Sequence, residues 1–356
     1  MKYDFSALSS VVTEADVISL KQIYKPKNKS LLVKYIKIIA VIIACIVGFS
    51  MLFVLFYSVI PFLIKDENFG IVPVIFIMFM FLMVAFGIIY SIKSDKKTWE
   101  QNVRLSRFTK ANDLSFELSL SHPGHSGLIF NIGELRIAED ILKNTTKKPT
   151  FEIANYTYTI TRSSGSGKDR HSDTTYYRYG YIMIQLNRKL PHMVLDSKSN
   201  NTSLFGASLS ALPMSFDNSQ ILSLEGDFDK YFTLYAPKEY EQDALYVFSP
   251  DLMSMFIDQS SQFDAEIVDD KLFIYSTKHF DFSNISLVQQ LFNIINKVGS
   301  LVVHNTNRYK DEMAAILPEN TVAETGRRLK VSYVGIYVAL AFIIIMFSVF
   351  FFMSSR

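Results

Sequence analysis

The residue types that most often bind metals or act as general bases are scattered along this chain. His122 and His125 are three residues apart, but they flank Pro123-Gly124, and neither a cysteine nor an acidic residue is nearby before Glu134. A zinc site needs three or four convergent ligands, so this spacing favours a solvated turn. The other histidines are isolated in the sequence: His171, His192, His279 and His304. His171 lies in a polar loop and is expected to be solvated there.

Two short motifs have a superficial likeness to known catalytic loops. Gly165-Ser166-Gly167-Lys168 has a glycine and a lysine in the order of a phosphate loop, but residue 162 is Arg, residue 169 is Asp, and a strand follows instead of a helix. Gly206-Ala207-Ser208-Leu209-Ser210 lacks the final glycine of a nucleophile elbow. We therefore interpret the first motif as a hairpin loop and assign no nucleophile to the second.

The remaining reactive residues indicate no coherent active site. The single cysteine, Cys45, lies in an apolar run. The carboxylates Asp227 and Asp229, like Asp269 and Asp270, are equally well explained by turns. The sequence thus predicts no catalytic residue, no cofactor site and no metal site, and it favours a protein that is not an enzyme.

Three apolar runs are the strongest pattern in the sequence. Residues 38–64, 71–92 and 331–353 contain no charged residue, and about 20 apolar residues in a helix span a bilayer core. The runs predict three transmembrane helices, which separate a tail at 1–37, a short external loop at 65–70, a folded domain at 93–330 and an external end at 354–356. The runs are longer than the apolar runs of about 10–14 residues that are typical of buried core helices.

Basic residues beside the runs predict an orientation. Seven lysines precede the first run, three follow the second, and two arginines and a lysine precede the third. The positive-inside rule then places the tail and the 93–330 domain in the cytoplasm, as parts of a multi-pass membrane protein. Subtracting the charges outside it from the chain's +2 leaves −2 on the 93–330 domain, which argues against nucleic acid as a partner.

Within the 93–330 domain the patterns predict hairpins and separate helices. Alternation predicts strands at 114–118 and 151–162, and a segment rich in tyrosine, isoleucine and methionine at 175–187 is predicted to be the return strand of a hairpin with 151–162. A further strand is expected at 231–235, and a tight hairpin at 266–275 around Asp269-Asp270. Helices are expected at 95–112, at 133–144, from Pro250 after the cap Ser249, and from Ser286. A short amphipathic helix is expected within 1–30 and a linker at 314–330. The fold class is therefore α+β, anchored by three transmembrane helices.

One region resembles a known family. Residues 224–235, with Phe228, Phe232 and Tyr235, and residues 244–252, ending in Ser249-Pro250-Asp251-Leu252, resemble bacterial membrane proteins known only by a domain of unknown function. Those proteins combine an N-terminal transmembrane hairpin with a cytosolic domain that carries F-x-x-x-F-x-x-Y and then A-x-x-x-x-[ST]-P. The third apolar run departs from that architecture. The resemblance implies a bacterial origin, and with it a multi-pass location in the bacterial inner membrane with the 93–330 domain facing the cytoplasm. It supplies no catalytic residues, and the matching residues are expected in core and cap positions.

Two hypotheses about function remain open at the level of the sequence. The first is a membrane-anchored, non-catalytic binding or scaffold module, in contact with the lipid bilayer, with a protein partner at the cytoplasmic membrane face and possible homo-oligomers formed through the spans. The alternative is a membrane-associated enzyme whose site is assembled from sequence-distant residues of the 93–330 domain. The sequence identifies neither a substrate nor a partner.

Overall fold

A computed structural model describes residues 2–24, 50, 71–164, 171–204, 207–224 and 226–332 of the chain. Two compact units are present: the first contains residues 1–9 and 105–356, and the second contains residues 10–104. The first unit holds the β-sheet and its helices. Each unit is described on its own below.

The second unit contains two described helices. Helix α1 (Glu14–Ile23) begins with a capping box, in which Thr13 and Asp16 bond reciprocally to each other's backbone N–H. Helix α3 (Ile71–Ala111) confirms the helix predicted at 95–112, and its residues from Leu105 onward belong to the first unit. Within the second unit, Lys21 lies 5.1 Å from the centre of the Trp99 ring, and Arg104 Nε donates to the Ser10 carbonyl at 3.2 Å. These contacts hold α1 against α3.

The described helices do not support the predicted membrane anchor. No helix among the described residues is both long enough and apolar enough to cross a membrane. Residues 71–92 are helical, as part of α3, but their assignment as a membrane span is therefore wrong, and so are the three-helix anchor and the multi-pass membrane location derived from it. Apolar content and length alone were insufficient grounds for the assignment. The other two predicted spans lie almost entirely outside the described residues. Only Ser50 of the span at 38–64, and Val331 and Ser332 of the span at 331–353, are described.

The described strands of the first unit form an antiparallel sheet in the order β1-β2-β3-β4-β8-β7, with β9 paired to β4. Strand β4 is the longest and pairs with β3, β8 and β9, so it is the axis of the sheet. The bounds are β1 Ser115–Ser121, β2 Glu134–Asn144, β3 Phe151–Ser164, β4 His171–Ser197, β7 Ile221–Leu222, β8 Phe232–Tyr235 and β9 Asp264–Ser276. A separate small hairpin joins β5 (Thr202–Leu204) to β6 (Ala207–Leu209).

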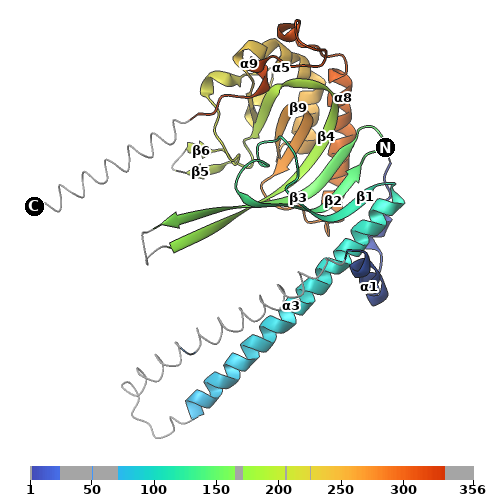
Figure 1. Ribbon diagram of the computed structural model, residues 1–356, viewed down its shortest axis with the longest axis vertical. Helices are drawn as coiled ribbons and strands as arrows, with labels where there is room; N and C mark the ends of the chain where they lie inside the picture. The colour runs from blue at the N-terminus through green and yellow to red at the C-terminus, as the bar shows by residue number, and fades with distance from the viewer. Residues whose placement is uncertain are drawn as a thin grey trace, which may run out of the picture. The chain divides into compact units, whose positions relative to one another are not determined.

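Helices cover one face of this sheet. The α-helices are α4 (Phe228–Tyr231), α5 (Glu241–Val247), α6 (Pro250–Ser260), α7 (Ile285–Ile294), α8 (Ser300–Thr306) and α9 (Glu324–Arg327). A π-helical turn, η6 (Ile295–Gly299), joins α7 to α8, and short 3-10 turns lie at η1 (Ser6–Ser9), η4 (Asn218–Gln220), η5 (Lys238–Tyr240) and η7 (Glu312–Ala314). Figure 1 shows α5, α8 and α9 beside the part of the sheet that contains β4 and β9.

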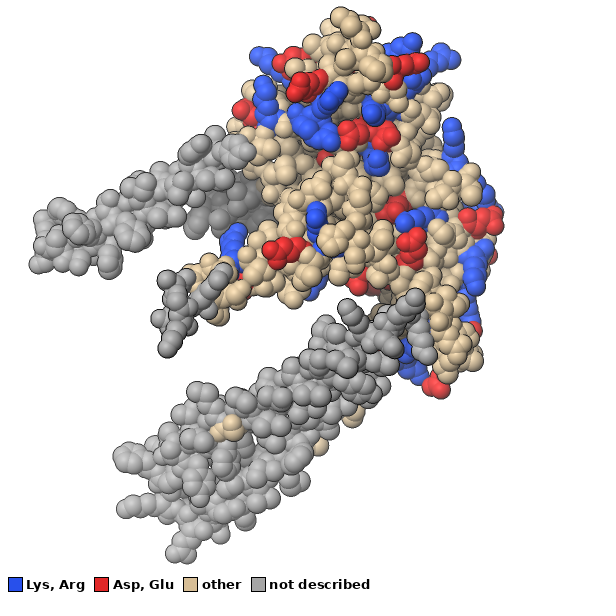
Figure 2. All heavy atoms as spheres, viewed as in Figure 1, with Lys and Arg blue, Asp and Glu red and all other residues tan. Residues whose placement is uncertain are grey.

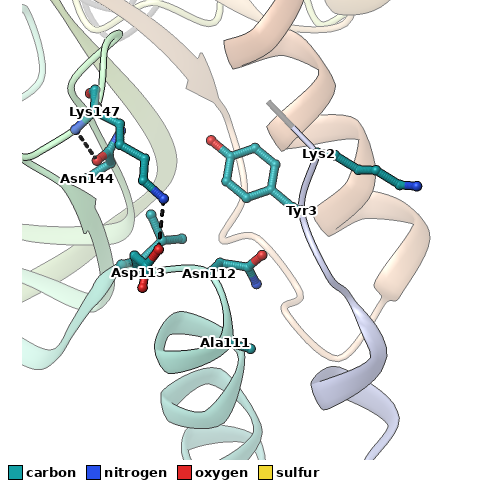
Figure 3. A pocket seen from close by; sticks show the side chains of 8 residues that line it. Lys2, Tyr3, Ala111, Asn112, Asp113, Asn144 and Lys147 are labelled. Atoms are coloured by element: carbon teal, nitrogen blue, oxygen red, sulfur yellow. Dashed lines mark hydrogen bonds and ion pairs between the residues drawn. The ribbon is translucent and has the colours of Figure 1, made fainter.

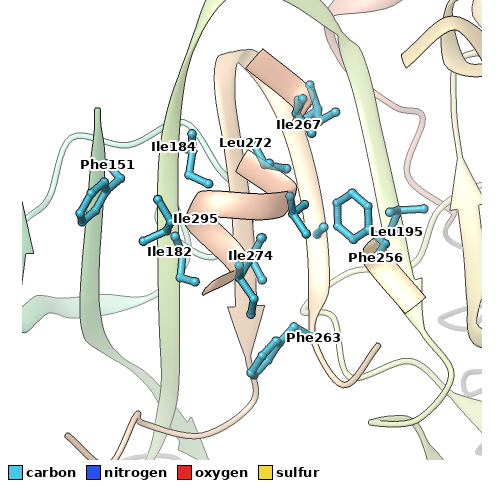
Figure 4. Packing of buried hydrophobic residues seen from close by; sticks show 14 of the residues in the cluster. Phe151, Ile182, Ile184, Leu195, Phe256, Phe263, Ile267, Leu272, Ile274 and Ile295 are labelled. Carbon is cyan, nitrogen blue, oxygen red and sulfur yellow. The ribbon is translucent and has the colours of Figure 1, made fainter. Parts of the chain in front are cut away.

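The main hydrophobic core lies between the sheet and α6, α7 and η6. Side chains of β3, β4 and β9 meet those of the helices there, as Ile182, Ile274 and Phe256 illustrate in Figure 4. Phe292 of α7 is the centre of an aromatic cluster, with ring centres of Tyr3 at 4.4 Å, Phe108 at 5.3 Å and Phe151 at 5.7 Å. This burial supplies most of the driving force for folding of the unit.

The opposite face of the sheet has its own aromatic cluster. Tyr158 stacks on Tyr177 and on Tyr179 with ring planes only 8° apart. Nearer the middle, Phe130 from the loop before β2 packs on Tyr156 and Tyr181. Buried tyrosines need partners for their hydroxyls, and these partners define the site described below.

Most of the predicted elements are confirmed, and two are wrong. The strands predicted at 114–118, 151–162, 175–187 and 231–235, and the helices beginning at Pro250 and near Ser286, are present; the prediction of an α+β fold with antiparallel hairpins is correct. Residues 133–144 form strand β2 instead of a helix. Residues 266–275 form one continuous strand, β9, instead of a tight hairpin. In both cases a non-glycine residue with positive φ (Asp140 in β2, Asp269 in β9) lies where the strand register shifts, so irregular strands were mistaken for other structures.

Candidate functional site

Two acid–histidine–tyrosine networks lie on the tyrosine-rich face of the sheet. In the first, Glu152 of β3 accepts hydrogen bonds from His125 Nε2 at 2.9 Å and from the Tyr181 hydroxyl, and Lys143 Nζ lies 3.4 Å from its other oxygen. Burial by itself would raise the pKa of Glu152, but the hydrogen bond and charge of His125, with Tyr181 and Lys143, hold that pKa below its ordinary value. The carboxylate is therefore ionised and fully paired.

In the second network, Glu266 of β9 is almost completely buried. Its Oε2 accepts from the Tyr275 hydroxyl at 2.6 Å and from the Leu128 N–H at 2.8 Å, and its Oε1 lies 3.0 Å from His192 Nε2. The Leu329 N–H donates to His192 Nδ1 at 3.0 Å. Since Nδ1 accepts, the proton of a neutral His192 is on Nε2 and points at Glu266. Burial, followed by the Glu266 charge, raises the pKa of Tyr275 well above its ordinary value, so the hydroxyl stays a donor.

These networks attach distant segments to the sheet. His125 and Leu128 belong to the loop before β2, and they bond to the strand carboxylates Glu152 and Glu266, respectively. Leu329 belongs to the segment after α9, and its N–H bonds to His192 of β4. The prediction that His125 lies in a solvated turn is therefore wrong, because its ring is held by Glu152 and packs on Phe130. The two networks therefore hold backbone segments in place. Each polar atom named above already has a hydrogen-bond or ion-pair partner within the chain.

Gly127 shows how closely the loop approaches the second network. A Cβ at this position would lie 2.2 Å from the Tyr275 hydroxyl oxygen and 3.0 Å from Glu266 Oε2. We expect Gly127→Ala to lower the free energy of unfolding by about 1–3 kcal/mol, because the new methyl must displace a buried hydrogen-bonded pair. Urea denaturation measures this loss. Gly124→Ala, in the same loop with no atom within 4 Å of the added Cβ, is the control and should unfold like the native protein.

Small cavities open on the surface of the described part of the first unit. One, of about 190 Å³, lies between the N-terminal segment and the end of α3 and is lined by Lys2, Tyr3 and Asn112, among others. Figure 3 shows Lys147 reaching Asp113 across it, an ion pair of 2.8 Å. The second, of about 250 Å³, lies beside residues 309–321. Both are smaller than the roughly 300–1,000 Å³ of pockets that enclose small-molecule ligands.

The most exposed part of the sheet is a two-stranded arm, which we define as residues 160–164 of β3 and 171–179 of β4. Pairing of β3 with β2 ends at Thr159, and pairing of β4 with β9 begins at Gly180. The two strands nevertheless stay paired with each other out to Ser164 and His171. Figure 1 shows them projecting beyond the rest of the sheet. Among the described residues, the outer edge of each strand of the arm has no neighbouring strand.

The motif residues chosen from the sequence have ordinary structural roles where they are described. Lys230 pairs with Asp227 at 2.7 Å, and Asp229 accepts the Leu224 N–H, so these carboxylates do not share a strand face. Asp269 pairs with Arg328, and Asp270 with Lys271. Phe228 and Phe232 are buried and Pro250 is at the start of α6, as expected for core and cap residues. Residues 165–168 lie outside the described residues, but β3 and β4 on either side form the predicted hairpin.

The charge distribution of the first unit has no dominant sign on the face seen in Figure 2. Lysine and arginine side chains lie interspersed with aspartates and glutamates there. Nucleic-acid binding typically uses a continuous basic surface. This face therefore gives no support to a nucleic-acid partner.

Comparisons with known proteins supply no family. No protein-family model and no curated protein matches the sequence. Among solved structures, a match is found to the crystal structure of the mycobacterial trehalose monomycolate transport factor A, TtfA, with 9% sequence identity and a TM-score of 0.33. It covers 55% of this chain and 95% of that chain. A likeness at this level carries no inference about function, and the resemblance to an uncharacterised bacterial family stays a prediction.

Proposed function

We propose that this protein is a non-catalytic binding module that holds an extended segment of a partner protein along the arm. The supporting observation is that β3 and β4 continue as a pair after their sheet neighbours have ended. The outer edge of β4 from His171 to Tyr179 offers nine consecutive residues to a further strand. A partner strand would pair there through main-chain hydrogen bonds.

The energetics of the arm support this use. An isolated two-stranded ribbon is marginally stable in water, and a long exposed edge is a hazard that proteins usually shorten, charge or cover. The described part of the arm has neither proline nor a run of like charges. A long ribbon whose edge is neither covered nor protected in these ways is best explained by a partner that pairs with the free backbone groups of that edge.

The side chains of the arm suggest how such a partner would be selected. Residues alternate between the faces, so Tyr177 and Tyr179 share one face with the stacked Tyr158, whereas Tyr176 and Arg178 share the other. Tyr176 is 57% exposed, with the Arg178 guanidinium 5.8 Å from its ring centre. Main-chain pairing would give the partner its affinity. The tyrosine rings on the two faces of the arm would favour apolar or aromatic side chains at alternate positions of the partner segment.

Site-specific photocrosslinking tests the proposal. We expect a benzophenone side chain in place of Tyr176 to form an adduct with a partner protein in cells that express the full chain. The matched control is the same replacement at Tyr246 of α5, which is similarly exposed at 49%. An adduct at 176 that is absent at 246 supports the proposal. Equal adducts at both positions, or none at 176, contradict it, and an adduct with a second copy would identify the occupant as the protein itself.

Shortening the arm provides a second, independent test. Ile160 lies opposite Thr175 in the register, so replacing residues 161–174 by Asn-Gly closes the hairpin with a two-residue turn. The described residues removed are exposed, so the melting temperature should stay within a few degrees of the native value. The adduct from position 176 should disappear. Persistence of that adduct at native yield would rule out the arm as the binding edge.

A further inference from the structure

The segment after α9 is attached to the first unit by its backbone, and we call residues 328–332 the strap. The Lys330 N–H donates to Gln220 Oε1 at 2.8 Å, and the Lys330 carbonyl accepts from Gln220 Nε2 at 2.8 Å. The Ser332 N–H donates to the Ser215 carbonyl at 2.8 Å. The strap is therefore bonded along its length to the residues around η4, much as one edge strand bonds to the next.

Two side chains of the strap add to this attachment. Arg328 forms a two-bond ion pair with Asp269 of β9, with both N–O distances at 3.1 Å. Leu329 is 6% exposed and packs with Val194 and Phe216. Burial alone would raise the pKa of Asp269, but the hydrogen bond and charge of Arg328 hold that pKa below its ordinary value. The Asp269 carboxylate therefore stays ionised at mildly acidic pH, and this ion pair does not respond to pH there.

One further bond of the strap depends on a proton. The Leu329 N–H donates to His192 Nδ1 at 3.0 Å, so this nitrogen carries no proton while the strap is docked. Histidine is the side chain whose charge ordinarily changes between pH 5 and pH 8. An imidazolium donates from both nitrogens, so a proton on Nδ1 would face the Leu329 N–H, donor against donor. The His192 ring is 3% exposed, so bulk water does not replace the lost acceptor.

The groups bonded to the His192 ring decide the sign of this effect. Among the described residues, the ring bonds to Glu266 and to the Leu329 N–H. Glu266 belongs to β9 and is present whether the strap is docked or released, so it changes the proton affinity of both states alike. The Leu329 N–H is present only in the docked state and opposes a proton there. Docking is therefore favoured at higher pH and is lost as the pH falls, because the released state binds the proton more tightly.

The charges farther from the ring do not reverse this sign. The titratable and charged groups on the neighbouring elements, among the described residues, are Glu266, Asp269 and Tyr275 on β9, Arg328 and Lys330 on the strap, Asp217 at the N-cap of η4 and His125 on the loop before β2. Those on β9, at η4 and on the loop are present in both states, and Arg328 is neutralised by Asp269. Lys330 comes near only in the docked state, and its positive charge disfavours an imidazolium in the same direction as the Leu329 N–H.

We propose that His192 acts as a pH-sensitive latch, in which a proton on Nδ1 releases the strap while the sheet stays folded. Release would uncover the apolar surface of Val194 and Phe216 that Leu329 now covers. Because one proton is taken up, the equilibrium constant for docking falls by at most about tenfold for each unit of pH. This device involves neither edge of the arm, so it is independent of the proposed function.

Hydrogen–deuterium exchange of the full chain at pH 8 and pH 5 tests the latch. We expect the protection factors of the Leu329, Lys330 and Ser332 amides, corrected for the intrinsic effect of pH on exchange, to fall by about tenfold or more at pH 5. The paired amides of β3 at 151–155 should keep their protection, because the sheet does not open. Unchanged protection of the strap at pH 5 would overturn the proposal, and so would an equal loss in β3, which would mean general unfolding.

Two replacements of His192 separate the roles of its two nitrogens. Asparagine places an amide oxygen near the position of Nδ1 and takes up no proton, so His192→Asn should keep the strap protected at both pH values. Glutamine reaches toward Glu266 instead and leaves the Leu329 N–H without an acceptor, so His192→Gln should lose protection at both. His125→Asn, in the other network, is the matched control and should keep the native response to pH. A native response that survives in His192→Asn would contradict the latch.

A spectroscopic measurement covers the case in which a variant unfolds. Nitrogen-15 NMR of the histidine rings in the native chain reports which ring nitrogen carries a proton. At pH 8 we expect the His192 proton on Nε2 alone, and at pH 5 a proton on both nitrogens, with a midpoint equal to that of strap release. A His192 Nδ1 that remains unprotonated at pH 5 would overturn the proposal.

Discussion

Glu266→Ala is expected to lower the free energy of unfolding by about 3 kcal/mol or more. The substitution leaves three buried donors without an acceptor: the Tyr275 hydroxyl, the Leu128 N–H and His192 Nε2. Each stranded donor costs about 1–3 kcal/mol. Chemical denaturation followed by circular dichroism measures the loss. Leu128 and His192 belong to segments far apart in the sequence, but both bond to Glu266. The protection of the backbone amides of both segments against hydrogen exchange should therefore fall together.

Glu266→Gln separates hydrogen bonding from side-chain volume. Glutamine has the same shape, but its amide nitrogen would face a donor in either orientation, since both glutamate oxygens accept. This variant should therefore also be destabilised, by about 1–3 kcal/mol. Glu139→Ala, an exposed acid of β2, is the matched control and should change stability by less than about 0.5 kcal/mol. A Gln variant as stable as the native protein would show that the three hydrogen bonds do not hold these segments.

Phe292→Ala is expected to lower the free energy of unfolding by about 3–5 kcal/mol. The ring is 1% exposed and is surrounded by Tyr3, Phe108 and Phe151, so its removal leaves a cavity among elements that cannot all close on it. The N-terminal segment should be released first, because Tyr3 depends on Phe292 for its closest ring contact. Urea denaturation gives the magnitude, and limited proteolysis near residue 3 reports the release.

Gln289→Ala is the matched control for Phe292→Ala. It lies on the same helix, α7, but on the exposed face, and alanine favours a helix, so its effect should lie within about 0.5 kcal/mol. A loss below about 1 kcal/mol for Phe292→Ala would contradict the central place given to this ring. It would indicate that the aromatic cluster contributes little beyond ordinary contact.

The regular parts of the fold were predictable from the sequence because they follow simple periodicities. Residues 156–161 alternate between aromatic or aliphatic residues and threonine, residues 175–187 are rich in tyrosine, isoleucine and methionine, and the strands that contain them form the longest strand pair of the sheet. Helix α6 was located by Pro250 at its first position and Ser249 at its N-cap, although the Ser249 side chain makes no capping hydrogen bond and instead accepts one from Asn305. Strand β2 was missed because positive-φ residues interrupt the alternation, and a sequence pattern cannot indicate which residue will bulge.

The functional features were less accessible from the sequence. His125 and Glu152 are 27 residues apart, and His192 and Glu266 are 74 apart, so only the tertiary fold brings each pair together. One usable signal was present: acids at 152, 264 and 266 lie in otherwise apolar strands, where a charge must find a partner. The apolar runs, by contrast, were over-interpreted as a membrane anchor.

Hydrogen–deuterium exchange along β4 tests the role of the arm most directly. In the protein alone, about every second amide of His171–Tyr179 points away from β3 and should exchange within seconds, whereas those bonded to β3 should exchange more slowly. In the presence of the partner identified by crosslinking, the outward-pointing amides should become protected, and those of Tyr181 to Gln185, already paired on both sides by β3 or β9, should not change. Outward-pointing amides that exchange equally fast with and without the bound partner would contradict strand pairing at this edge.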